Sequence, residues 1–132
     1  MAEMIQFDLV SPEKMLASMQ ASEVEIPGAE GDFTAMAEHQ ALITTLRPGV
    51  LKVKGASDTT EFVVTGGFVE VSATTTSILA EVAIPRGDVT RQTVEDMVAE
   101  AETAATEAGA SVKDAADKRV ADTKALLDVL GL

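Results

Sequence analysis

The spacing of apolar residues changes once along this chain, between residues 83 and 90. Before the change, short β-branched runs alternate apolar and polar residues and are repeatedly interrupted by Pro and Gly. After Thr90 there is no proline, and apolar residues recur every three or four positions. Alternation is typical of half-buried strands and the longer spacing of amphipathic helices. The sequence therefore predicts a β-domain over residues 1–86 and a helical region over residues 87–132.

The first region carries the turn residues that such a β-domain needs. Ile5, Phe7 and Leu9 alternate with period two and share one face, and the proline in Ser11-Pro12-Glu13 should end this strand because it cannot donate to a ladder. We expect residues 27–32 to form a loop, and Gly66-Gly67 to form a hairpin turn between two strands. Many short strands at close spacing favour an antiparallel sandwich or a flattened barrel.

Two helices are predicted after residue 90. Gly109 should end the first in the left-handed conformation, and Ser111 with Asp114 resembles a capping box that starts the second. A connection of two or three residues would force the helices to lie antiparallel. The expected apolar stripes are Val94, Met97, Val98, Ala101, Ala104, Ala105 and Ala108, and then Val112, Ala116, Val120, Leu127 and Leu130.

Charge excludes two classes of partner. Asp and Glu number 22 against 10 Lys and Arg, which gives a net charge of −12. Such a surface repels the phosphates of nucleic acid and anionic lipid headgroups, so we expect no nucleic-acid binding and no direct lipid insertion. We also expect no signal peptide, because the start of the chain is neither basic nor continuously apolar.

The residues that catalysis or metal binding would require are scarce. The chain has no cysteine, and His39 is its only histidine, so neither a thiolate site nor a multi-histidine metal site is expected. No phosphate-binding or nucleophile-elbow motif is present. We expect no catalytic residues, no metal and no cofactor. A lone histidine and an acidic turn are most often ordinary surface features, and a partner contact is the sharper interpretation of both.

Four segments resemble one known family. They are Phe7-Asp8-Leu9-Val10-Ser11-Pro12-Glu13, Pro27-Gly28-Ala29-Glu30-Gly31-Asp32-Phe33, the run from His39 to Gly49, and Gly66-Gly67-Phe68-Val69-Glu70-Val71. In this order and spacing, over about residues 5 to 84, they resemble epsilon subunits of F-type ATP synthases. The resemblance implies an N-terminal flattened antiparallel β-sandwich followed by a C-terminal antiparallel two-helix hairpin.

The resemblance also implies a function and partners. It implies a non-catalytic rotor subunit of the central stalk, peripheral to the cytoplasmic face of the bacterial inner membrane, which couples proton-driven rotation to ATP synthesis. By positional match, Glu30, Gly31 and Asp32 would face the ring of c subunits. Ser11 and His39 would lie at or near the contact with the gamma subunit. The hairpin could reach the alpha and beta subunits.

Some family members bind ATP through a helical motif and extend the hairpin to inhibit hydrolysis. In this chain Asp117 and Arg119 lie only two positions apart, so they cannot share a helix face as that motif requires. The chain from Asp88 onward is also acidic, which would disfavour insertion of the hairpin between acidic partners. We therefore expect a weak or absent inhibitor. An ATP-sensing subunit with an inhibitory hairpin remains the alternative, followed by an unrelated β-sandwich enzyme or carbohydrate-binding module.

Overall fold

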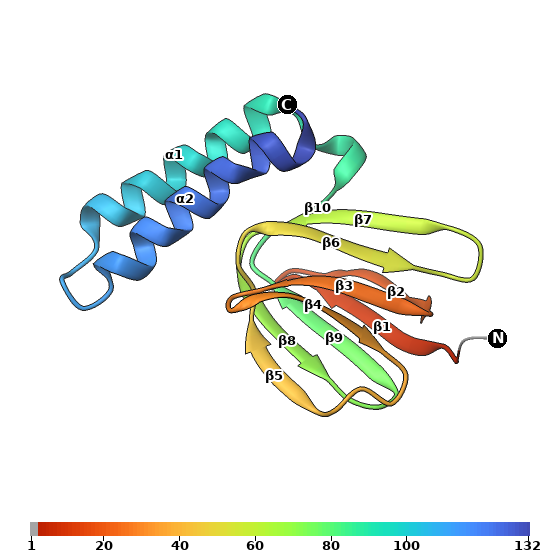
Figure 1. Ribbon diagram of the computed structural model, residues 1–132. Helices are drawn as coiled ribbons and strands as arrows, with labels where there is room; N and C mark the ends of the chain where they lie inside the picture. The colour runs from red at the N-terminus through yellow and green to blue at the C-terminus, as the bar shows by residue number, and fades with distance from the viewer. Residues whose placement is uncertain (1–2) are drawn as a thin grey trace. The chain divides into compact units, whose positions relative to one another are not determined.

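The computed structural model describes residues 3–132 as two compact units, the first ending at Arg86 and the second covering Gly87–Leu132. The first unit is a sandwich of two five-stranded sheets, and the second consists of two helices after a short 3₁₀ turn, Arg86–Asp88 (Figure 1). The predicted sandwich followed by two helices is therefore confirmed.

Each sheet mixes strands from distant parts of the sequence. Sheet A has the order β2-β1-β9-β8-β5, and sheet B has the order β10-β7-β6-β3-β4. All pairings are antiparallel except that of β1 with β9, which is parallel. The strands are β1 (Ile5–Val10), β2 (Met15–Ala21), β3 (Glu23–Gly28), β4 (Gly31–Met36), β5 (Leu42–Thr45), β6 (Gly49–Lys54), β7 (Thr59–Val64), β8 (Gly67–Val71), β9 (Thr75–Ala80) and β10 (Ala83–Pro85).

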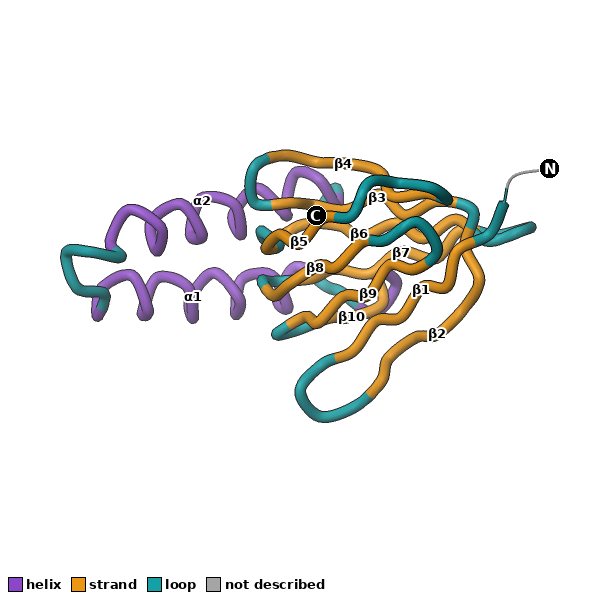
Figure 2. The backbone as a smooth tube through the Cα atoms, turned by 90° about the horizontal axis from the view of Figure 1, so that it is seen from below, coloured by secondary structure: helices purple, strands orange, loops and turns teal. Residues whose placement is uncertain are grey.

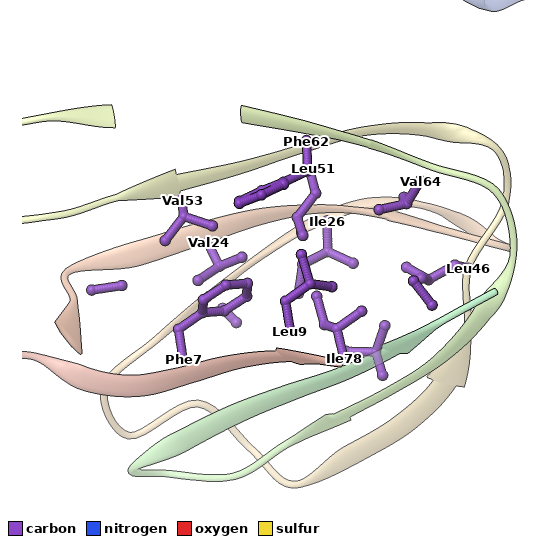
Figure 3. Close-up of a cluster of buried hydrophobic side chains, with 14 of the residues drawn as sticks. Phe7, Leu9, Val24, Ile26, Leu46, Leu51, Val53, Phe62, Val64 and Ile78 are labelled. Carbon is purple, nitrogen blue, oxygen red and sulfur yellow. The ribbon is translucent and has the colours of Figure 1, made fainter. Parts of the chain in front are cut away.

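The core lies between the sheets and follows the predicted alternation. On β1 the odd-numbered residues from 5 to 9 are buried, while the even-numbered ones face outward. Aliphatic side chains fill most of the space, as expected for a chain without Trp or Tyr. Figure 3 shows Phe7 and Leu9 of sheet A packed against Val24 and Ile26 of sheet B. Burial of such side chains contributes about 1.5–3 kcal/mol each.

The hairpin predicted at Gly66-Gly67 is wrong. Strand β7 pairs with β6 and β10 in sheet B, whereas β8 pairs with β5 and β9 in sheet A. The two glycines therefore carry the chain from one sheet to the other. Gly67 has a φ of 129°, and a Cβ there would lie 2.0 Å from the backbone oxygen of Leu79. Only glycine fits this close crossing.

The loop predicted over residues 27–32 is much shorter than expected. Pro27 and Gly28 belong to β3 and pair with Asp32 and Gly31 of β4. Only Ala29 and Glu30 form the turn between these strands. A turn-forming composition marks where a chain reverses, but strand pairing can still extend into it.

The second unit is an antiparallel helical hairpin, as predicted. Helix α1 (Arg91–Glu107) and helix α2 (Lys113–Leu130) lie side by side and are joined by residues 108–112 (Figure 2). This connection is longer than the two or three residues expected. Neither helix is long and apolar enough to cross a membrane, a finding that covers the described residues only.

The helix caps differ from the prediction. The capping box lies at the start of α1, where Thr90 accepts a hydrogen bond from the backbone of Thr93 and the Thr93 side chain accepts one in return. Helix α2 begins after Val112, and no side chain caps it there, so Ser111 does not act as expected. Helix α1 ends at Ala108 in an extended conformation and not at a left-handed Gly109.

The apolar stripes were predicted in part. Val94, Ala101 and Ala105 of α1 are buried, whereas Ala104 is exposed. On α2 the buried positions are Thr123 and Leu126, which the predicted stripe omitted, and Val112 is 53% exposed. Thr123 is accommodated because its hydroxyl donates to the Arg119 carbonyl oxygen at 2.6 Å.

Candidate functional site

The acidic turn, Glu30, Gly31 and Asp32, is exposed, and Arg47 ties it to the connection between β5 and β6. The Arg47 guanidinium forms an ion pair with the Asp32 carboxylate and donates to the Gly28 carbonyl oxygen at 2.6 Å. The Arg47 backbone N–H also donates to the Pro27 carbonyl oxygen at 3.0 Å. These bonds hold the turn in a fixed shape and leave the Glu30 side chain facing solvent.

Ser11 begins the turn between β1 and β2. Its backbone N–H donates to the Lys14 carbonyl oxygen at 2.9 Å, and the Lys14 N–H donates back to Ser11 at 3.3 Å. The Ser11 hydroxyl donates to the same Lys14 oxygen at 3.3 Å. The hydroxyl therefore stabilises the turn.

His39 lies in the connection between β4 and β5. Its Nδ1 is 2.6 Å from the Gln40 carbonyl oxygen, and its ring centroid is 6.3 Å from that of Phe33. The preceding residue, Glu38, has a φ of 66°, the left-handed region that favours glycine. The Glu38 N–H donates to the Ala73 carbonyl oxygen at 2.8 Å, so this connection is attached to the turn between β8 and β9.

The strand register shows which of these residues lie together. The beginning of β1 adjoins the beginning of β9, because Gln6 pairs with Thr75 and Val10 with Leu79. His39 therefore lies at the end of the sandwich where β1 begins, and Ser11 lies at the opposite end, about 20 Å away along the strand. The acidic turn lies at the Ser11 end, since Gly28 bridges Leu46 and the Leu46 N–H donates to the Gly67 carbonyl oxygen.

An apolar strip crosses the outer face of sheet A at this same end. Pairing places Met15, Val10, Leu79 and Phe68 in one row over four neighbouring strands. Met15, Leu79 and Phe68 are 59%, 47% and 58% exposed, and Ile43 of β5, which is 73% exposed, pairs with Glu70 in the next row. Four adjacent apolar side chains on an otherwise acidic protein are typical of a surface that a partner covers.

The next row on the outer face of sheet A is acidic. Asp8 on β1 and Glu70 on β8 flank Ser77 on β9. Ser18 and Gln6 both donate to Oδ1 of Asp8, at 2.7 and 3.0 Å. These hydrogen bonds, first from Ser18 and then from Gln6, lower the pKa of the Asp8 carboxyl below its ordinary value.

The outer face of sheet B has a different arrangement of charge, because its carboxylates are paired with cations. Glu23 lies 2.8 Å from Lys54, and Lys52 lies 3.7 Å from Glu25 and 3.6 Å from Glu61. Arg86 approaches Glu61 at 3.0 Å. This face neutralises its own charges within the sandwich.

The apolar strip is not apparent from the sequence, because each strand contributes only one residue to it. An apolar residue at an outward position of a strand is the signal that could have identified each member. Across residues 3–132, no group of three or more His, Cys, Asp or Glu residues is arranged to hold a metal ion. The apolar strip is the feature of the sandwich that favours a binding surface.

Several known proteins are similar to this chain over nearly its whole length. Residues 4–86 match the family model described as the β-sandwich domain of the ATP synthase delta/epsilon chain. A protein of Fuscovulum blasticum named ATP synthase epsilon chain is 50% identical over 131 residues, 99% of each chain. The ATP synthase epsilon chain of Rhodobacter capsulatus is 52% identical over 126 residues, 96% of each chain.

Two solved structures share the fold. A chain in the Euglena gracilis mitochondrial ATP synthase structure, described as OSCP/F1/c-ring, aligns with a TM-score of 0.73 at 20% identity, covering 96% of this chain and 81% of that one. A chain in the Tetrahymena thermophila mitochondrial ATP synthase structure, described as central stalk and c-ring, aligns with a TM-score of 0.58 at 26% identity. That alignment covers 67% of this chain and 72% of the other.

Proposed function

The chain belongs to the ATP synthase epsilon chain family, and from this premise we propose that it is a non-catalytic rotor subunit of the central stalk of an F-type ATP synthase. It couples proton-driven rotation of the c-ring, through the gamma subunit, to ATP synthesis in the catalytic head. It works at the cytoplasmic face of the bacterial inner membrane as a peripheral subunit. Catalysis resides in other subunits.

The observation that carries this proposal is the presence of two unlike surfaces at one end of the sandwich. The acidic turn is polar and solvent-exposed, whereas the apolar strip is typical of a surface that is buried by a partner. A subunit held between two different partners requires two such surfaces. Their proximity would let force pass from one partner to the other through a well-packed β-domain.

We assign the acidic turn to the c-ring contact. Arg47 fixes the turn through Asp32 and Gly28, so the turn should deform little under torque from the c-ring. Glu30 remains available to a polar or cationic group on the ring. A fixed turn suits the transmission of torque better than a long flexible loop would.

We assign the outer face of sheet A to the gamma contact. Ser11 lies beside the apolar strip, while His39 lies at the far end, so a gamma contact that includes both must extend over about 20 Å. The apolar strip would supply most of the binding free energy, since exposed aromatic and aliphatic side chains gain most from burial.

The charge of the helical hairpin favours weak or absent inhibition of ATP hydrolysis by this subunit. From Asp88 onward there are five Lys and Arg against ten Asp and Glu. Three of those cations form ion pairs within their own helices, Arg91–Glu95, Lys113–Asp117 and Lys118–Asp122. A segment with this excess of carboxylates is poorly suited to contact acidic alpha and beta subunits. The spacing of Asp117 and Arg119 disfavours the ATP-sensing alternative, because residues two apart do not share a helix face; that alternative predicts measurable ATP binding by the isolated chain.

The test is co-purification of the tagged chain from detergent-solubilised membranes, followed by stripping and add-back in an ATP hydrolysis assay. We expect alpha, beta and gamma subunits to be recovered, with little change in hydrolysis on add-back. Strong suppression of hydrolysis would favour the alternative, in which the hairpin inhibits ATP hydrolysis. Absence of gamma from the recovered complex would refute the rotor assignment.

The c-ring assignment is tested with Asp32→Lys in the assembled enzyme. The change breaks the ion pair with Arg47 and places two cations together in the turn, so proton-driven ATP synthesis should fall several-fold. The matched control is Asp58→Lys, an equal charge change in the turn between β6 and β7 at the opposite end of the sandwich. Equal synthesis rates for the two variants would contradict the assignment.

A further inference from the structure

The two sheets treat their outward carboxylates differently. In sheet B each of Glu23, Glu25 and Glu61 has a Lys or Arg within 4.0 Å, the distance that defines an ion pair. The described strands of sheet A contain no Lys or Arg at all, and their only charged residues are Asp8 and Glu70. The acidic row therefore has no internal source of positive charge.

The cations in the turns beside the apolar strip do not supply positive charge to the acidic row. Lys14 lies in the turn after β1, beyond the apolar strip, and Arg47 is engaged by Asp32. Both hydrogen bonds to Asp8 involve Oδ1. They fix the orientation of the carboxylate while Oδ2 accepts no hydrogen bond within residues 3–132. The side chain of Glu70 is exposed, and it forms no hydrogen bond or ion pair within the same residues.

The position of the acidic row next to the apolar strip makes these charges costly to cover. Rows along a strand are about 7 Å apart, so a partner that buries the strip must also approach Asp8 and Glu70. Carboxylates taken out of water without a compensating cation are strongly destabilising. The partner must therefore bring positive charge with it or leave the strip exposed.

Resting on the rotor function proposed above, we propose that the gamma surface which covers the apolar strip carries two Lys or Arg side chains that pair with Asp8 and Glu70. Asp8 and Glu70 are separated by one intervening strand, so the two cations lie about 10 Å apart. They sit on one flank of an apolar patch that contacts Phe68 and Leu79. The cations also orient gamma, because reversing it would bring them over the apolar strip.

The test measures the affinity of purified gamma for the full chain at low and high ionic strength, comparing wild type with Glu70→Gln. Removing the carboxylate leaves a gamma cation unpaired, so affinity at low salt should fall by at least about tenfold. The loss of affinity with added salt should be less steep than for wild type. Glu25→Gln on sheet B is the matched control, with the same change in net charge, and should bind like wild type.

The outcomes separate the inference from the function on which it rests. Wild-type chain that fails to bind gamma would refute the rotor function itself. Binding by wild type with Glu70→Gln and Glu25→Gln equally affected would overturn the charge pairing and leave the function intact. Phe68→Ala addresses the strip: unchanged affinity would show that gamma binds elsewhere, and a large loss would support the proposed patch. Circular dichroism of each variant confirms that it is folded.

Discussion

Replacing Thr76 with valine should stabilise the sandwich. Thr76 lies on β9 between Phe7 of β1 and Val71 of β8, and its side chain is fully buried. Its Oγ1 has no hydrogen-bond partner within residues 3–132. An unpaired buried hydroxyl destabilises the folded state by about 1–3 kcal/mol. Valine removes this penalty, but its slightly larger methyl group is less well accommodated in the core and offsets part of the gain. The free energy of unfolding should therefore rise by about 1 kcal/mol.

The assay is urea unfolding followed by far-ultraviolet circular dichroism, because the chain has no Trp or Tyr for fluorescence. With an m-value of about 1–3 kcal/mol per M, a gain of about 1 kcal/mol raises the urea midpoint by about 0.3–1 M. Thr75→Val, at an exposed position of the same strand, removes a hydroxyl that is hydrogen-bonded to Ser72 at 2.8 Å and should therefore not raise stability. A lower midpoint for Thr76→Val with an unchanged m-value would mean that the hydroxyl is hydrogen-bonded in solution, and the reasoning would fail.

Three further changes test other parts of the structure. Gly67→Ala should destabilise the sandwich by about 3 kcal/mol, because its Cβ would collide with a backbone oxygen at a positive φ; a loss below 1 kcal/mol in urea unfolding would contradict this. Thr90→Ala should cost the hairpin about 1 kcal/mol, whereas Ser111→Ala should cost nothing measurable, since only Thr90 caps a helix. Thermal unfolding monitored by helical circular dichroism compares the two. Asp8 has a lowered pKa, so its contribution to stability is present above about pH 4 and is lost as the pH falls through the lowered pKa. The stability difference between wild type and Asp8→Asn should therefore vanish in acid, and a difference that persists there would show that the carboxylate's hydrogen bonds are not the cause.

Local sequence patterns predicted elements better than they predicted pairing. The alternation of β1 and the stop at Ser11 required only period and proline, and both appear in the structure. The hairpin at Gly66-Gly67 failed because the runs on either side have equal β-propensity whether or not they pair. Strand β7 joins sheet B by pairing with β6, and β8 joins sheet A by pairing with β5. The sequence around Gly66-Gly67 carries no information about these partners.

The candidate surfaces were predictable to different degrees. The acidic turn was visible as a continuous motif, but its attachment to Arg47 depends on the packing of a later segment. The spacing of Ser111 and Asp114 predicts a capping box at α2. The capping box that forms, Thr90 with Thr93, is harder to predict because it uses threonine where Glu or Gln is usual. Patterns of spacing can be met by several sites, and tertiary structure decides among them.

The parallel pairing of β1 with β9 has a consequence for how the protein is made. Val10 finds its partner Leu79 only after about 70 further residues have been synthesised, at roughly 5–20 residues per second. Until then the nascent chain holds the apolar face of β1 without its central neighbour, and β2 alone covers one edge. Sheet A closes late, so the newly made chain passes through a stage in which chaperones or fellow nascent chains compete for that edge.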